Sequence, residues 1–418
     1  MEEIKEAKER VVLVGVHTGA LNPLEDTTEE SMEELALLVE TAGGEVVGEF
    51  VQNRPGIDKG TFVGDGKLIE IRDFCQMNDV DALIFDDELT GAQIRNIERE
   101  VKIKVTDRSA LILDIFAQRA LTREGKIQVE LAQLKYMLPR LTGSSANLSR
   151  LGGGIGTRGP GETKLESDRR HIRGRILTLS QRLEEVVKNR EIQRHARKKE
   201  NIPQISIIGY TNAGKSTLLN YLTDAGVLAE DKLFATLDPT ARKLTLEDGT
   251  ELILVDTVGF IRKLPHHLIK AFRSTLEEAA LADVLLHVVD SSSSYCCEQI
   301  EVTKKLLDEL GAGSKPVVTV FNKADIADTS VPMPPVENAV YISAKTGKNV
   351  DKMLEIIKKI LPETKMNLRV LIPYDKGALL APIYANAVVK GEEHTEDGTL
   401  LEIIIDKKLF SIVEGYVL

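Results

Sequence analysis

The sequence predicts a multidomain α/β protein built from four consecutive parts. Two observations point to this class. Strand and helix patterns alternate in two separate stretches of the chain, and a phosphate-binding loop joins a strand to a helix in the second of them. The predicted parts are an N-terminal parallel α/β domain (1–124), an antiparallel helical hairpin with a glycine-rich tip (125–200), a P-loop domain (201–362) and a small α+β C-terminal domain (363–418).

The composition is typical of a globular protein with a large core. Of 418 residues, 42% are hydrophobic and 28% are charged, and the net charge is −11. General disorder and a wholly basic nucleic-acid coat are therefore excluded, whereas a local basic patch is still allowed. The three cysteines exclude a disulfide framework and favour a reducing compartment. The first ten residues lack the apolar stretch of a signal peptide, and no apolar run is long enough to cross a bilayer. We therefore expect a cytoplasmic protein without a membrane anchor.

Residues 1–124 alternate between strand and helix patterns. Val11–Val16 is typical of a buried strand, and Thr27 with Glu30 predicts a capping box for a helix over Ser31–Thr41. Further strands are expected at EVVGEFVQ, DALIFD and VKIKVTD, with helices near 67–77, after Thr90 and from Ser109. This alternation predicts a parallel sheet covered on both faces. No catalytic signature stands out in this part.

Apolar residues recur at steps of three and four on both sides of a glycine-rich segment in residues 125–200. Such spacing is typical of amphipathic helices that pack against each other. The apolar residues are Ile127, Leu131, Leu134 and Leu138, then Ile172, Ile176, Leu179, Leu183 and Val186. The intervening RLGGGIGTRGPGET cannot be helical, so a helical hairpin with a long tip is predicted. Its Gly154-x-Gly156-x-x-Gly159 resembles a dinucleotide fingerprint, but a helix precedes it where that motif requires a strand.

The second helix of this hairpin is basic. Residues 162–200 carry twelve basic and seven acidic side chains in a chain that is acidic overall. A solvated surface helix would explain this excess, and so would a nucleic-acid contact. The flexible basic loop beside the helix favours the nucleic-acid contact.

The strongest motif is GYTNAGKS, which matches G-x-x-x-x-G-K-S between the strand QISII and the helix STLLNYL. Backbone N–H groups of such a loop hold phosphate oxygens, Lys215 reaches the β- and γ-phosphates, and the Ser216 hydroxyl binds Mg²⁺. The residues expected to bind nucleotide here are Gly209, Asn212, Ala213, Gly214, Lys215, Ser216 and Thr217.

Three further motifs follow in order, each at the end of a predicted strand. In DTVGF, Asp256 is placed to hold Mg²⁺ through water and Gly259 to sense the γ-phosphate. In NKAD, Asp325 can accept hydrogen bonds from guanine N1 and N2, a pair that adenine does not offer. NKAD also supplies Asn322 and Lys323. The third motif is SAK, whose Ser343, Ala344 and Lys345 are the remaining predicted base-side residues. Together the four motifs predict a P-loop GTPase domain that binds GTP and GDP with Mg²⁺.

FATLDPT, between the phosphate loop and DTVGF, is expected to be the first switch segment. We prefer Thr236 to Thr240 as the Mg²⁺ ligand, because proline restrains the second threonine, and we include Phe234 among the nucleotide-binding residues. Phe260 occupies the position of the glutamine that orients water in Ras-like enzymes. A phenyl ring cannot do this, so slow intrinsic hydrolysis is predicted, and the catalytic residue is unassigned.

The segment Gly152–Arg170, GGGIGTRGPGETKLESDRR, is similar to the hallmark of the HflX family of ribosome-associated GTPases, and the order of the four parts agrees with that family. The resemblance implies binding to the 50S subunit and the 70S ribosome, ribosome-stimulated GTP hydrolysis, and splitting or rescue of stalled or hibernating ribosomes. It also implies that the glycine-rich tip points toward 23S rRNA. The residues expected to contact this RNA are Arg150, Arg158, Lys164, Arg169 and Arg170.

Some alternatives stay open within this resemblance. A GTP-gated RNA-binding scaffold for large-subunit assembly, or a tRNA-modifying GTPase, would use the same motifs. Some related GTPases hold K⁺ with an asparagine at the position of Asn212, although an amide that stabilises the loop is equally consistent. Ala241 departs from the usual switch pattern, which more often has a hydroxyl residue there. A second nucleotide site in the N-terminal domain has no phosphate loop to support it. We expect a monomer.

Overall fold

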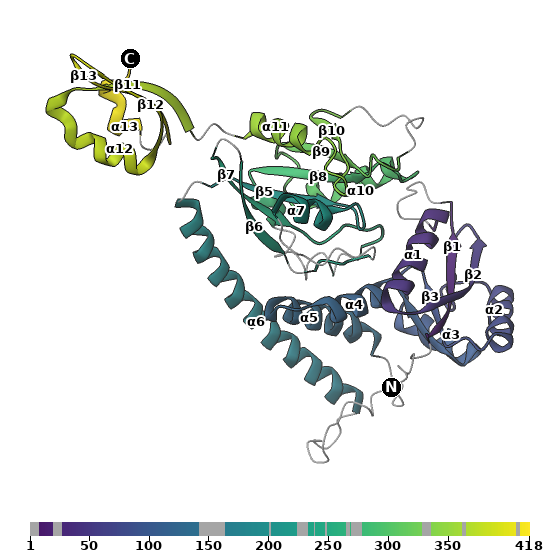
Figure 1. Ribbon diagram of the computed structural model, residues 1–418. Coiled ribbons are helices and arrows are strands. Elements are labelled where there is room, and N and C mark those ends of the chain that lie inside the picture. Colours follow the sequence, from purple (N-terminus) through teal and green to yellow (C-terminus); the bar gives the residue numbers. More distant parts are fainter. Residues whose placement is uncertain are drawn as a thin grey trace, which may run out of the picture. The chain divides into compact units, whose positions relative to one another are not determined.

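The computed structural model divides the chain into two compact units, Met1–Ile357 and Lys358–Leu418 (Figure 1). The larger unit holds two sheets and a pair of long helices, and the smaller holds one sheet. The structure describes residues 8–19, 27–141, 164–199, 202–223, 233–237, 239–246, 249–264, 268, 278–327, 336–361, 365–406 and 410–418. Among these, no helix combines the length and apolar character needed to cross a membrane.

A four-stranded parallel sheet in the order β2-β1-β3-β4 forms the N-terminal part, as predicted. Alternate residues of β1 and β3 point to opposite faces. Val11, Leu13 and Ile84 pack against α1 and α4 on one face, whereas Val12 and Phe85 pack against α2 and α3 on the other. The elements are β1 (Arg10–His17), α1 (Glu29–Ala42), β2 (Glu45–Asn53), α2 (Asp65–Met77), β3 (Ala82–Phe85), α3 (Gly91–Val101), β4 (Lys104–Asp107) and α4 (Arg108–Arg119).

The start of α1 differs from the prediction. Thr28, not Thr27, is the N-cap and accepts a hydrogen bond from Ser31 N, so the predicted capping box of Thr27 and Glu30 is wrong. The Thr27 hydroxyl instead bonds to Asp86 and Asp87, each at 3.1 Å. The contacts with these two aspartates take the Thr27 side chain away from the cap position.

The two long helices α5 (Arg123–Arg140) and α6 (Lys164–Lys199) pack together through the predicted apolar stripes. The packed residues are Ile127, Leu131, Leu134, Ile176, Leu179 and Leu183. Arg175 also makes two hydrogen bonds to Glu130, at 2.7 and 2.9 Å, which joins the helices at the surface. The predicted glycine-rich tip lies outside the described residues.

A six-stranded sheet in the order β10-β9-β8-β5-β7-β6 forms the predicted P-loop domain. Its strands are parallel apart from β6, which runs antiparallel to β7. β8 is buried along nearly its whole length, as expected for the centre of a covered parallel sheet. The elements are β5 (Gln204–Gly209), α7 (Lys215–Thr223), β6 (Thr240–Thr245), β7 (Glu251–Asp256), β8 (Val284–Asp290), α10 (Cys296–Glu309), β9 (Val317–Asn322), β10 (Ala339–Tyr341) and α11 (Val350–Ile360).

The smaller unit is an antiparallel sheet in the order β11-β13-β12 with short helices against it, which agrees with the predicted α+β module. Its core includes Val370, Ile383, Leu401 and Val413. The elements are β11 (Lys365–Ile372), η2 (Tyr374–Leu379), α12 (Leu380–Asn386), β12 (Ala387–Thr395), β13 (Gly398–Asp406), α13 (Phe410–Val413) and η4 (Glu414–Tyr416).

Candidate nucleotide site

The phosphate loop leaves β5 and enters α7 with a backbone that demands its glycines. Gly209 has φ 147° and Gly214 has φ 91°. A Cβ at Gly209 would lie 2.1 Å from Val288 O, and one at Gly214 would lie 2.3 Å from Asn322 Nδ2. Asn212 adopts the left-handed conformation at φ 60°, which asparagine tolerates better than most residues. The loop shape therefore follows from its sequence.

Lys215 lies buried at the start of α7. Its Nζ donates to Tyr210 O at 2.7 Å. Burial lowers the pKa of Lys215 to about 8, against the opposing effect of the Asp256 carboxylate. A buried ammonium group with so few anionic partners is well suited to receive phosphate oxygens.

Three side-chain oxygens meet beside this lysine. Ser216 Oγ lies 2.8 Å from Thr236 Oγ1 and 2.7 Å from Asp256 Oδ2. The other oxygen of Asp256 is buried and has no hydrogen-bond partner among the described residues. Hydroxyl and carboxylate oxygens are the ligands that Mg²⁺ prefers, directly or through water, so these three residues fit the ion. Thr240 instead lies in β6, paired with Asp256 in the strand register, so the geometry favours Thr236 as the candidate.

A pocket is formed where the phosphate loop meets the first switch segment and residues 256–264, called the second switch segment from here on. Its lining includes most of the predicted phosphate-side residues together with three that were not predicted, Thr211, Ala235 and Thr257. The predicted members are Asn212, Gly214, Lys215, Ser216, Thr217, Phe234, Thr236 and Gly259.

On the base side, Asn322 joins three motifs. Its Nδ2 donates to Ala213 O at 2.9 Å, and its Oδ1 accepts from Ala344 N at 2.9 Å. Asp325 is exposed, and a hydrogen bond from Ser343 lowers its carboxyl pKa, which keeps the group ionised to accept hydrogen bonds. Lys323 Nζ pairs with Asp290 at 2.6 Å, and Lys345 is exposed.

The two phenylalanines named in the sequence analysis lie in different surroundings. Phe260 is 1% exposed and belongs to the hydrophobic core, so it cannot reach a reacting water. Phe234 lines the pocket but also packs edge-on against Phe116 of α4, with ring centroids 4.7 Å apart. The first switch segment is therefore held by the N-terminal part of the chain.

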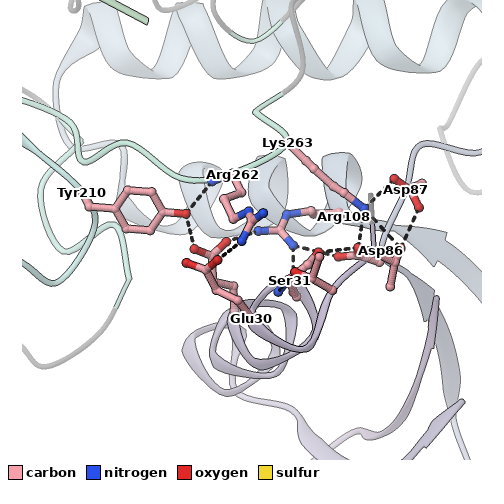
Figure 2. A network of polar contacts seen from close by, with 11 residues as sticks. Glu30, Ser31, Asp86, Asp87, Arg108, Tyr210, Arg262 and Lys263 are labelled. Carbon is pink, nitrogen blue, oxygen red and sulfur yellow. Dashed lines mark hydrogen bonds and ion pairs between the residues drawn. The ribbon is translucent and has the colours of Figure 1, made fainter. Parts of the chain in front are cut away.

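A buried polar network links the second switch segment to the N-terminal sheet (Figure 2). Lys263 Nζ contacts Asp86 at 2.5 Å and Asp87 at 2.7 Å, and Arg262 pairs with Glu30. Burial alone would raise the pKa of Asp86, but Arg108 and Lys263 together lower it to about 2. The aspartate is therefore held as an anion between two cations.

Tyr210 of the phosphate loop completes this network (Figure 2). Its hydroxyl accepts from Arg262 N at 2.8 Å and donates to the Glu34 carboxylate. Burial raises the pKa of Glu34. The Arg108 guanidinium opposes this by favouring the charged form, since its Nη2 lies 2.5 Å from Glu34 Oε2. Sequence reasoning missed this network. The available signals were the adjacent Arg262 and Lys263 just after DTVGF, and the paired aspartates after β3.

The residues expected to contact RNA are only partly described. Arg169 is half-buried and its Nη2 donates to Leu141 O at 2.7 Å, so it also ties α6 to the end of α5. Arg170 is exposed on α6. Arg150, Arg158 and the side chain of Lys164 lie outside the described residues.

A glycine-shaped phosphate loop, a cluster of oxygens for Mg²⁺ and base-side motifs at the ends of parallel strands define the class of P-loop GTPases. Family models agree along almost the whole chain. They are described as GTP-binding GTPase N-terminal (29–117), GTP-binding GTPase middle region (119–197), 50S ribosome-binding GTPase (204–323) and HflX C-terminal domain (333–409). The chain belongs to the HflX family of GTPases.

Relatives from several bacteria match over most of their length. The chain is 51% identical over 411 residues to GTPase HflX of Lacrimispora saccharolytica, covering 98% of this chain and 96% of the relative. It is 53% identical to GTPase HflX of Caldanaerobacter subterraneus, covering 90% and 86%, and 41% identical to that of Escherichia coli K12, covering 94% and 93%. A GTP-binding protein of Sulfolobus solfataricus, solved in complex with GDP, is 27% identical with a TM-score of 0.44, covering 84% and 98%.

Proposed function

We propose that this GTPase binds the large ribosomal subunit and splits stalled or hibernating 70S ribosomes, and that the ribosome stimulates its hydrolysis of GTP. Two findings support the proposal. The segment 204–323 matches the model described as 50S ribosome-binding GTPase, and the neighbouring hairpin carries an excess of basic residues. The chemistry of GTP hydrolysis belongs to the family, and the use of its free energy on ribosomes is the proposed step.

The proposal depends most on the contacts that join the second switch segment to the N-terminal domain. Gly259 lies beside the phosphate loop, and Lys263 reaches Asp86 from only four residues further along. A γ-phosphate that draws the Gly259 N–H toward itself must also move Arg262 and Lys263. The contacts of α1 and β3 with the GTPase domain then depend on which nucleotide is bound. Differential affinity of the two arrangements for the ribosome would drive subunit separation.

We further infer that Mg²⁺ is held by Ser216, Thr236 and, through water, Asp256, and that K⁺ binding by Asn212 is an option for this loop. When bound, Mg²⁺ neutralises charge on the phosphates. Comparing GTP turnover in K⁺ and in Na⁺ at constant ionic strength tests the second inference. Equal rates would contradict a role for K⁺.

The expected RNA contacts, Arg150, Arg158, Lys164, Arg169 and Arg170, would bind 23S rRNA mainly through its phosphates. Aromatic residues make up 4% of the chain and none is tryptophan, so recognition by base stacking is disfavoured. Because the proposed partner is the ribosome, we expect this protein in the cytoplasm.

Light scattering of 70S ribosomes tests the proposed function. Protein loaded with a non-hydrolysable GTP analogue should lower the 70S signal within the time of mixing, whereas GDP-loaded protein should not. Binding to 50S subunits with an unchanged 70S signal would overturn splitting and favour the assembly scaffold. Splitting that requires hydrolysable GTP would contradict the idea that binding of GTP is sufficient.

A further inference from the structure

The GTPase reaction of this chain lacks the usual group for orienting water. Hydrolysis needs a water in line with the bond between the γ-phosphorus and its bridging oxygen. The residue after Gly259 is Phe260, which is buried in the core and bridged to Tyr210 of the phosphate loop. Another polar group near Gly259 must take over if the chain orients water with a residue of its own.

Thr211, the third residue of the phosphate loop, lies in the right place. A Cβ built on Gly259 would be 2.8 Å from Thr211 Cγ2 and 2.9 Å from Thr211 Cα, so the two residues are in direct contact. Thr211 N also donates to Phe260 O at 2.8 Å, which fixes the loop against the second switch segment. Thr211 is among the residues that line the pocket, and its Cγ2 methyl is the side-chain atom that lies against Gly259. Rotation of the side chain to another staggered χ1 rotamer places the hydroxyl where this methyl lies.

The hydroxyl of Thr211 is unused in this structure. The residue is 7% exposed, and its Oγ1 is buried without a hydrogen-bond partner among the described residues. Three other hydroxyls of the same pocket are engaged. Ser216 and Thr236 bond to each other, and Thr257 donates to Ile207 O at 2.7 Å. A buried hydroxyl without a partner is costly, so its retention in a functional pocket calls for a partner in another state.

We propose that Thr211 is a catalytic residue whose hydroxyl binds the attacking water and the γ-phosphate. In this role its oxygen accepts a hydrogen bond from the water, and its O–H donates a hydrogen bond to a γ-phosphate oxygen while keeping its proton. The water oxygen forms a bond to the γ-phosphorus, and the bond from phosphorus to the β,γ-bridging oxygen breaks. The electron pair of that bond leaves with GDP. The proton lost by the water ends on a γ-phosphate oxygen, so Thr211 is unchanged after the reaction.

Two substitutions separate the hydroxyl from the shape of the side chain. Thr211→Val is nearly isosteric but has no hydroxyl, whereas Thr211→Ser keeps the hydroxyl and loses a methyl group. Thr303→Val serves as the matched control, because Thr303 is fully buried in α10 and its hydroxyl bonds to Gln299 O within the same helix. Single-turnover hydrolysis of GTP is measured without ribosomes, and affinity for GDP is measured with a fluorescent analogue.

The hydroxyl of Thr211 should act on the rate and not on binding. Thr211→Val should hydrolyse GTP at least about tenfold more slowly, because removal of one group that contacts the transition state costs that much or more. Its affinity for GDP should stay within about twofold, and Thr211→Ser and Thr303→Val should hydrolyse GTP at nearly the wild-type rate. Thr211→Val with the wild-type rate overturns the proposal. So does an equal loss of rate in Thr211→Val and Thr211→Ser, which would indicate packing, or a parallel loss of GDP affinity.

Discussion

At the scale of single residues, the lining of the candidate nucleotide pocket was largely predictable, because the phosphate loop is a local motif. GYTNAGKS must bring glycines, a lysine and a serine to one strand-to-helix turn, and the structure places Ser216, Thr236 and Asp256 within hydrogen-bond distance. Thr211 was not predicted, since its importance comes from contact with Gly259, which sequence spacing does not reveal.

Asp325→Asn should change which base the site accepts. The carboxylate is exposed and held ionised by Ser343, so it is available to guanine N1 and N2. An amide presents one acceptor and one donor, which suits xanthine and mismatches guanine. We expect GTP affinity to fall by roughly 100-fold, with xanthosine triphosphate bound more tightly than GTP in competition assays. Unchanged GTP affinity would contradict the base-reading role.

Nucleotide binding should take up a proton through Lys215. Its pKa is about 8 without phosphate nearby, so at pH 8 about half the molecules carry a neutral amine. Phosphate oxygens favour the ammonium and raise this pKa, so binding of GDP at pH 8 should take up about half a proton. At pH 6.5 the lysine is already protonated and contributes almost nothing. Calorimetry in buffers of different ionisation enthalpy measures the difference, and equal proton counts at the two pH values would refute it.

At the scale of helices and strands, periodicity predicted the elements better than their contacts. The alternation in residues 1–124 gave the correct parallel sheet, and the apolar steps in α5 and α6 gave the correct packing. The predicted N-cap of α1 was wrong, because the hydroxyl of Thr27 hydrogen-bonds to Asp86, nearly sixty residues away in sequence. Contacts between elements far apart in sequence depend on how the elements pack, and local spacing carries no information on them.

Lys263→Ala should loosen the second switch segment from the N-terminal domain. Asp86 and Asp87 would lose a buried partner, although Asp86 keeps Arg108. We expect the free energy of unfolding to fall by about 1–3 kcal/mol in urea titrations, with faster amide exchange over residues 258–264. Lys243→Ala is the control, because its ion pair with Glu251 is half exposed and should cost less than about 1 kcal/mol. Equal stability of the two variants would argue against a stabilising role of the network.

At the scale of the whole molecule, the order of the parts was predictable, whereas their joining was not. One hydrophobic core includes Leu35 and Phe116 from the N-terminal part together with Phe234 and Phe260 from the switch segments. The sequence showed these as separate apolar residues in two domains. Packing makes the first unit a single body in which both switches touch the N-terminal domain.

Neutralising the basic hairpin should weaken ribosome binding without changing intrinsic hydrolysis. The triple variant Arg158→Gln, Lys164→Gln, Arg170→Gln removes up to three phosphate contacts, so the slope of log affinity against log salt should flatten by about two to three units. The control triple Arg72→Gln, Lys243→Gln, Arg369→Gln removes surface cations that are paired with carboxylates. Co-sedimentation with 50S subunits over a range of KCl concentrations measures both. An unchanged slope in the first triple would show that the hairpin is a solvated surface.

We propose that nucleotide state and ribosome engagement are coupled through the switch segments. The most direct test is the rate of GTP hydrolysis by the full chain with and without purified 50S subunits. We expect an acceleration of at least about tenfold that saturates with subunit concentration. An identical rate at saturating subunits would contradict it.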